Sequence, residues 1–201
     1  LLEIAGRAGK PASSHTVGFI LTPRLNAAGR ADDPEIALRL LLEDDPRQAA
    51  ELARRLDKLN EERRQLEKSI LSGANEYLRR DDRIENDLVL IAEGQGWHEG
   101  VLGIVAARIA EQSNRPVLIL SSEREIARGS ARSFCGYNIY EALAACGGLL
   151  LTYGGHATAA GLSLSRRQIP QLRDSMNRRA REAAAGGAFA PPALQIDAEA
   201  S

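Results

Sequence analysis

Two short apolar runs on either side of a helical pattern constrain the fold of this chain more than any other feature. The runs are residues 87–92 (DLVLIA) and 116–120 (PVLIL), and each has the length and composition of a buried strand. Between them, glycines at 94 and 96 predict a turn that leads into a helix from about Gly100 to Gln112. A strand, a helix and a strand with short connections predict a parallel, right-handed pair.

The rest of the C-terminal half adds elements to this unit. We expect a strand at 126–133, a helix from the Asn138 cap to about Cys146, a strand at 159–164 and an amphipathic helix after Pro170. The predicted fold class is therefore α/β, a small mixed sheet with flanking helices at residues 84–186. Small residues and prolines at 183–192 predict a linker, and 194–197 predict a first strand, so residues 187–201 form a linker and the start of a truncated domain.

Residues 1–83 predict a helical arm. After a loop at 6–18, Asp33-Pro34 predicts the start of a short helix, and Asp45-Pro46 with Gln48 predicts a capped helix to about Leu78. Its apolar positions follow a heptad seam that Arg63 and Gly73 interrupt. A dimeric coiled coil is one interpretation. A connecting helix packed along its own protein, between two domains, is the interpretation that the interruptions favour.

Composition excludes several classes of protein. The 201 residues carry 26 Lys and Arg against 27 Asp and Glu, a net charge of −1 that gives no global sign of a nucleic-acid partner. No apolar run approaches the roughly 20 residues of a membrane helix, so we expect no membrane span. Two cysteines suit a reducing compartment. Three histidines without metal-ligand spacing give no complete catalytic centre, and the start at Leu1 rather than Met predicts a fragment.

Two segments in the first half of the chain have the chemistry to bind anions. Residues 22–30 (TPRLNAAGR) place Arg24, Asn26 and Arg30 on what we expect to be a turn bounded by proline and glycine. Residues 94–103 (GQGWHEGVLG) open the helix after the first strand, where free N–H groups favour anions. Each segment has a structural alternative, namely a turn with solvated arginines and a helix start. Trp97 could stack on a base, although a single tryptophan at a helix start is more often a packing residue. Arg108, two turns into that helix, is either a surface residue or a second phosphate contact.

Two later segments have the same chemistry. Alternation along 128–133 (RGSARS) places Arg128, Ser130 and Arg132 on one face of a strand, as a phosphate grip or as a solvated face. Residues 154–161 (GGHATAAG) surround a histidine with small residues that allow close approach of the backbone to a ligand. The residues of this segment that matter for binding are Gly154, Gly155 and His156.

The four segments, in this order, resemble the C-terminal half of the RecJ family within the DHH phosphoesterase superfamily. The matching stretches are PRLNAAGR (23–30), GWHEGVLGIVAARI (96–109), GSARS (129–133) and GGHATAAG (154–161), and the similarity covers nearly all of residues 1–186. The last motif is shared by DHH-associated domains of oligoribonucleases, cyclic-dinucleotide phosphodiesterases and alanyl-tRNA synthetase. The first motif, followed by a long helix, is more specific to RecJ, and Ile196-Asp197 resembles the start of that family's oligonucleotide-binding barrel.

The resemblance implies a single-strand-specific 5′→3′ DNA exonuclease of repair and recombination in the bacterial cytoplasm. Its manganese or magnesium would be held by an N-terminal DHH domain that this chain lacks, so the chain would bind no metal and be inactive alone. Single-stranded DNA with a 5′-phosphate, that DHH domain, and a helicase or single-strand-binding protein are the implied partners. The implied substrate contacts are Arg24, Asn26, Arg30, Trp97, Arg108, Ser130, Arg132, Gly154, Gly155 and His156.

Within that set the resemblance gives specific roles to three residues. Ser130 and Arg132 would grip the terminal 5′-phosphate, and His156 would stabilise charge near the scissile phosphate, its only catalytic role. Two alternatives stay open. One is a phosphodiesterase of short RNA or cyclic dinucleotides, and the other is a non-catalytic helical interaction module.

Overall fold

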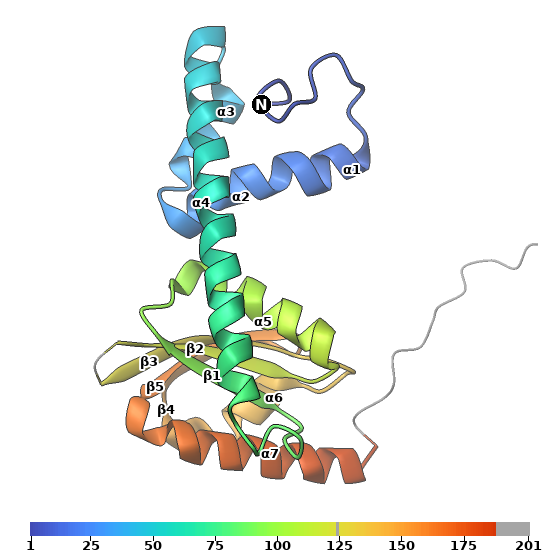
Figure 1. Ribbon diagram of the computed structural model, residues 1–201, viewed down its shortest axis with the longest axis vertical. Helices are drawn as coiled ribbons and strands as arrows, with labels where there is room; N and C mark the ends of the chain where they lie inside the picture. Colours follow the sequence, from blue (N-terminus) through green and yellow to red (C-terminus); the bar gives the residue numbers. More distant parts are fainter. Residues whose placement is uncertain (124, 188–201) are drawn as a thin grey trace, which may run out of the picture. The chain divides into compact units, whose positions relative to one another are not determined.

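The computed structural model describes residues 1–123 and 125–187 (Figure 1). The chain divides into two compact units, of which the first is residues 1–69 and the second begins at Ile70. One long helix, α4 (Pro46–Arg79), contributes residues to both units. The two units are described separately below.

The first unit is helical. It contains α1 (Ser14–Thr16), a π-helical turn (Val17–Leu21), α2 (Thr22–Ala31), α3 (Glu35–Leu42) and the first part of α4. The expected turn at residues 22–30 is wrong, because this segment is the body of α2, with Pro23 in its first turn where proline is tolerated. The expected loop at 6–18 is likewise helical from Ser14 onward.

Local capping chemistry sets the predicted helix starts. Asp33 Oδ1 accepts a hydrogen bond of 2.9 Å from the Glu35 backbone N–H, and Asp45 Oδ1 accepts one of 2.8 Å from Arg47 N–H. The Asp45 backbone N–H donates to Glu43 Oε1 at 3.0 Å, and not to the Gln48 side chain as the capping-box prediction required. The long helix itself is confirmed, at 34 residues.

The first part of the heptad seam of α4 is buried within its own chain. Leu56 and Leu59 lie in a cluster with Ala27 and Ala28 of α2 and with Ile36 of α3. This stretch of the seam is therefore not available to a second copy, in agreement with the interpretation of a connecting helix. At the Arg63 interruption, the guanidinium pairs with the Glu67 carboxylate one turn later, at 2.8 Å between Nη1 and Oε2.

The second unit contains a five-stranded sheet in the described residues, in the order β1-β2-β3-β5-β4. Its strands are β1 (Leu90–Gln95), β2 (Val117–Glu123), β3 (Ile126–Arg132), β4 (Leu150–His156) and β5 (Ala159–Ser165). The predicted pair is confirmed: β1 and β2 are parallel and joined by α5 (Glu99–Ser113), and the remaining pairings are antiparallel. The α/β class and the mixed sheet are therefore as predicted.

Two boundaries and one strand differ from the expectation. β1 begins at Leu90 and continues through Gly94, which we had placed in a turn. β4 was not predicted. The final helix α7 (Ile169–Ala185) includes residues 183–185 of the expected linker, whereas the expected strand at 194–197 lies outside the described residues.

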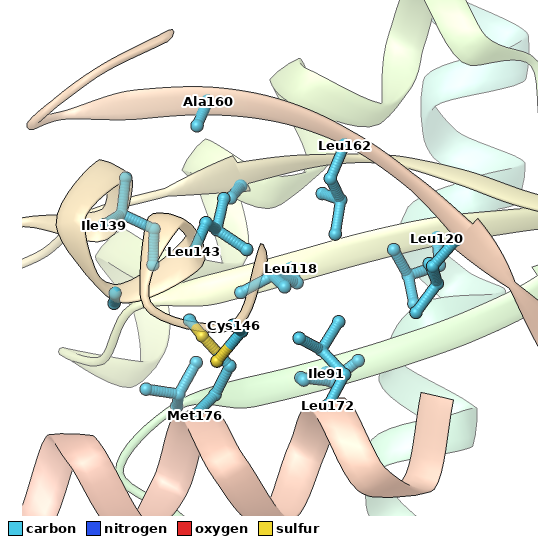
Figure 2. Close-up of a cluster of buried hydrophobic side chains, with 14 of the residues drawn as sticks. Ile91, Leu118, Leu120, Ile139, Leu143, Cys146, Ala160, Leu162, Leu172 and Met176 are labelled. Carbon is cyan, nitrogen blue, oxygen red and sulfur yellow. The ribbon is translucent and has the colours of Figure 1, made fainter. Parts of the chain in front are cut away.

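Helices lie on both faces of the sheet, with α5 on one face and α6 (Ile139–Ala144) and α7 on the other (Figure 1). The core lies between the sheet and helices α6 and α7. Figure 2 shows Leu118 and Leu120 of β2 above Leu172 and Met176 of α7, with Leu143 of α6 beside them. Strand alternation sends the neighbouring residues to the α5 face.

A buried ionic cluster ties α7 to the segment between α4 and β1. Arg173, 5% exposed, donates from Nε to Asp87 Oδ2 at 2.6 Å and from Nη1 to Asp81. One turn later, Asn177 Oδ1 accepts the backbone N–H groups of Leu88 at 2.7 Å and Val89 at 3.0 Å. These bonds give hydrogen-bond partners to the backbone N–H groups just before β1, where the chain enters the sheet.

Candidate anion-binding face

The sheet brings the third and fourth segments together on the face that carries α5. Ser130 of β3 pairs with Gly161 of β5, which in turn pairs with Gly154 of β4. In the next such row, Arg132 pairs with Ala159, and Ala159 with His156. Residues directly opposite one another project from the same face. A floor of Gly161 and Ala159 therefore separates the Ser130–Arg132 side from the His156 side.

The polar side of this floor is a row along β3. Ala127 and Ala131 are buried in the core, so Arg128, Ser130 and Arg132 project to the opposite face, as alternation predicts. Arg132 Nη1 donates to Ser130 Oγ at 2.9 Å and to the Ala131 carbonyl at 2.8 Å. The guanidinium and the hydroxyl are thus held together as one unit.

Helix α5 approaches this unit at Gly103. A Cβ atom at residue 103 would lie 2.5 Å from Arg132 Nη2 and 3.1 Å from Ser130 Oγ. Only glycine permits this contact without moving the guanidinium. Gly103, in the second segment, therefore makes room for the side chain of Arg132, in the third segment.

The histidine side of the floor is an edge strand. Gly154, Gly155 and His156 are all exposed at the end of β4. Gly155 has φ +143°, and a Cβ there would lie 2.4 Å from the Ala159 carbonyl oxygen. Glycine is therefore required for β4 to pair closely with β5, and this pairing presents the His156 imidazole to solvent.

Trp97 and Arg108 are placed differently from the β3 row. The Trp97 indole lies against Gly73 of α4 and Gly94 of β1, which supports the packing role that the sequence left open. Arg108 is exposed on α5, five residues after Gly103, and at about 100° per residue this puts it on another side of the helix. The structure does not bring either residue to the Ser130–Arg132 pair.

The arm residues belong to the first unit. Arg24 is 17% exposed and pairs with Asp57 of α4, at 2.8 Å from Nε to Oδ1, while its Nη1 donates to the Ile20 carbonyl at 2.7 Å. Asn26 is exposed and Arg30 is half-buried, four residues apart on one side of α2. Arg24 points instead toward α4, so the three predicted contacts do not form a single cluster.

Sequence reasoning missed three polar residues near the face. His98 caps α5 by accepting the Gly100 N–H at Nδ1, 3.2 Å away; histidine is not among the usual N-cap residues, so no signal identified it. Thr152 of β4 and Ser163 of β5 lie with their hydroxyl oxygens 2.6 Å apart. Alternation along the predicted strand 159–164 could have identified Ser163, whereas Thr152 would have been found only if β4 had been predicted.

The described residues do not fit a metal centre. Within 1–123 and 125–187, no three His, Cys, Asp or Glu side chains are grouped so that they could hold an ion. In the same part of the chain, every helix is too short or too polar to cross a lipid bilayer.

Comparisons with known proteins agree on one family. Residues 86–182 match the DHHA1 domain. The chain is 37% identical over 179 residues to the single-stranded-DNA-specific exonuclease RecJ of Bacillus subtilis, which covers 88% of this chain and 22% of that protein. It is 39% identical over 171 residues to RecJ of Escherichia coli K12, which covers 82% of this chain and 30% of that protein.

A solved structure gives the same result. The crystal structure of RecJ from Thermus thermophilus in complex with Mg²⁺ superposes with a TM-score of 0.78 at 34% identity, covering 90% of this chain and 28% of that one. The same protein has also been solved with Mn²⁺. The chain thus spans about a quarter of the length of the relatives that it matches.

Proposed function

Because residues 86–182 form a DHHA1 domain and the chain is homologous to part of the RecJ exonucleases, we propose that its sheet face binds single-stranded DNA by a 5′-phosphate end. The observation that carries this proposal is the register that places Ser130 and Arg132 opposite His156 across Gly161 and Ala159. Two phosphate-binding sides with a floor of small residues suit a sugar–phosphate chain lying on the sheet.

The terminal phosphate goes to Ser130 and Arg132. A planar guanidinium binds two phosphate oxygens at once, and the hydroxyl of Ser130, which accepts from Arg132, has a hydrogen to donate. A terminal monoester carries about −1.5 to −2 charges at pH 7, more than an internal diester. The pair therefore favours a strand end, which would give the parent enzyme its exonuclease character.

His156 serves the phosphate that is cleaved. Its exposed position at the end of β4 lets it donate a hydrogen bond to developing negative charge, while Gly154 and Gly155 allow the strand to approach the backbone. The divalent metal that would activate water belongs in this proposal to a DHH domain outside the chain. The chain alone is accordingly expected to bind DNA without hydrolysing it.

The remaining assignments follow the family. We assign residues 1–83 to an arm that joins the DHH domain and residues 84–186 to the DHHA1 domain. The expected linker at 187–201 lies, beyond Gly187, outside the described residues. Asn26, Arg30, Arg24 and Arg108 are secondary DNA contacts in this assignment. The parent protein would act in DNA repair and recombination in the bacterial cytoplasm, with a helicase or single-strand-binding protein as partner.

The test is a titration of the chain with 12-residue oligothymidylates that carry a 5′-phosphate or a 5′-hydroxyl. We expect the phosphorylated strand to bind about tenfold more tightly, and Arg132→Ala to abolish this difference. Arg178→Ala, an exposed arginine of α7 on the opposite side of the sheet, is the matched control and should preserve it. Equal affinities for both strands in the unaltered chain would overturn the assignment. Tighter binding of 5′-phosphorylated RNA or of a cyclic dinucleotide would replace DNA as the substrate.

A further inference from the structure

A second polar hollow opens on the same face, beside Ser130 and away from His156. It has a volume of about 390 Å³, and its polar lining comes from Arg128 and Ser130 of β3, Thr152 of β4, Ser163 of β5 and Glu99 of α5. None of these residues except Ser130 belongs to the phosphate grip described above. The hollow therefore adjoins the grip at Ser130 and otherwise uses different residues.

The sheet register organises this hollow as a second row. Arg128 pairs with Ser163, and Ser163 with Thr152, so that their side chains follow one another across three strands. This row lies two residues from the row of Ser130, Gly161 and Gly154, a step of about 7 Å along the strands. A guanidinium followed by two hydroxyl groups, one of which donates to the other at 2.6 Å while the other keeps its hydrogen to donate, suits a phosphodiester.

Arg128 is positioned by an exchangeable partner. Its Nη1 lies 3.5 Å from Glu99 Oε1, and the two side chains are 62% and 59% exposed. An exposed pair at this separation contributes little to stability. A phosphate that forms a bidentate contact with Arg128 can therefore displace the Glu99 carboxylate.

We infer that the hollow formed by Arg128, Thr152 and Ser163 binds an internal phosphodiester of the strand whose 5′-phosphate is held by Ser130 and Arg132. This inference rests on the proposed function and extends it from a grip on one phosphate to a grip on two. Glu99 acts in it as a competing anion, because its carboxylate occupies Arg128 until the DNA arrives.

The experiment compares a one-phosphate ligand with a longer strand. The chain is titrated with thymidine 5′-monophosphate and with 5′-phosphorylated tetrathymidylate, and binding is followed by NMR at several salt concentrations. We expect Arg128→Ala to weaken binding of the tetranucleotide roughly fivefold and to leave the affinity for the mononucleotide unchanged. The logarithm of the binding constant falls linearly with the logarithm of the salt concentration, and loss of one phosphate contact to a single strand should make this slope about 0.7 shallower for the tetranucleotide.

Two further variants sharpen the test. Thr152→Val, which keeps the side-chain shape, should weaken only the tetranucleotide. Glu99→Gln should strengthen binding of the tetranucleotide, because it removes the competing carboxylate. Glu182→Gln makes the same charge change on α7 and should leave this affinity unchanged.

The outcomes separate this inference from the proposed function. If Arg128→Ala changes both ligands equally or changes neither, while Arg132→Ala weakens both, the second subsite is wrong and the terminal grip stands. If Arg132→Ala changes neither ligand, the proposed function fails and the second subsite fails with it.

Discussion

Arg132 turns back along its own strand to donate a hydrogen bond of 2.9 Å to Ser130, two residues earlier. The two side chains leave the same face of β3, and Gly103 of α5 lies so near them that an added Cβ would fall 2.5 Å from Arg132 Nη2 and 3.1 Å from Ser130 Oγ. The position of the guanidinium therefore depends on the helix as well as on the strand. A change in α5 at Gly103 can therefore alter binding at this face without altering the stability of the fold.

Replacing Gly103 by alanine should damage binding and leave the fold intact. The new Cβ would meet the end of the Arg132 side chain, which can move away without disturbing the core, and alanine is favoured over glycine in a helix by about 1 kcal/mol. We expect an unchanged or higher melting temperature and a smaller preference for 5′-phosphorylated DNA. Gly148→Ala, where no atom lies within 4 Å of the added Cβ, is the control. An undiminished 5′-phosphate preference in Gly103→Ala would contradict this role of the helix.

The Arg173 cluster makes the opposite prediction. Arg173→Met would leave Asp81 and Asp87 without the guanidinium that pairs both of them, at 17% and 8% side-chain exposure. Removing one partner of a buried ionic cluster costs about 3–5 kcal/mol. We expect urea unfolding to show a loss of that size, against less than about 0.5 kcal/mol for Arg178→Met on the exposed side of the same helix. Equal losses in the two variants would show that the cluster contributes nothing specific.

The same cluster predicts sensitivity to acid. Burial alone would raise the pKa of Asp81, but the hydrogen bonds from Arg173 and from the Arg83 backbone, with the charges of both arginines, hold that pKa below its usual value. A carboxyl whose pKa is lower in the folded state stabilises the protein above the unfolded pKa of about 3.9. This stabilisation is lost as the pH falls through the lower, folded value. The free energy of unfolding of Asp81→Asn should therefore differ from that of the unaltered chain at pH 7, and the difference should shrink as the pH falls below the unfolded pKa of about 3.9. Parallel pH profiles would disprove the linkage.

The two cysteines should react differently. Burial raises the pKa of Cys146, which lies in the core with Leu143 and Met176, so little thiolate forms there. Cys135 is partly exposed in the segment between β3 and α6. Iodoacetamide at pH 8 should alkylate one thiol per native chain, mapped to Cys135 by peptide mass spectrometry, and both thiols in urea. Rapid labelling of Cys146 in the native chain would be inconsistent with the core.

Elements that are set by interactions between residues close in the sequence were predictable, and elements that depend on distant residues were not. The starts of α3, α4 and α6 were predictable because Asp33, Asp45 and Asn138 act on backbone groups two or three residues away. The strand β4 was not, because Gly154 and Gly155 are typical of turns and become a strand only through pairing with β5. Proline and glycine similarly concealed α2, whose Ala27 and Ala28 are buried against α4.

The candidate site divides in the same way. Alternation within β3 was enough to place Arg128, Ser130 and Arg132 on one face. The proximity of His156 to that row depends on the strand order β3-β5-β4, which no local pattern determines. The contact between Gly103 and Arg132 likewise joins residues 29 positions apart in the sequence, so that only the folded structure reveals it.

The most direct test of the central claim observes Arg132 itself. Arginine Nε–Hε signals of the ¹⁵N-labelled chain are assigned by substitution and followed while 5′-phosphorylated and 5′-hydroxyl oligothymidylates are added in parallel. We predict a shift of the Arg132 signal with the phosphorylated strand that is absent with the hydroxyl strand, together with an unchanged Arg178 signal. An Arg132 signal that moves equally with both strands, or with neither, would contradict the assignment of this face to a 5′-phosphate.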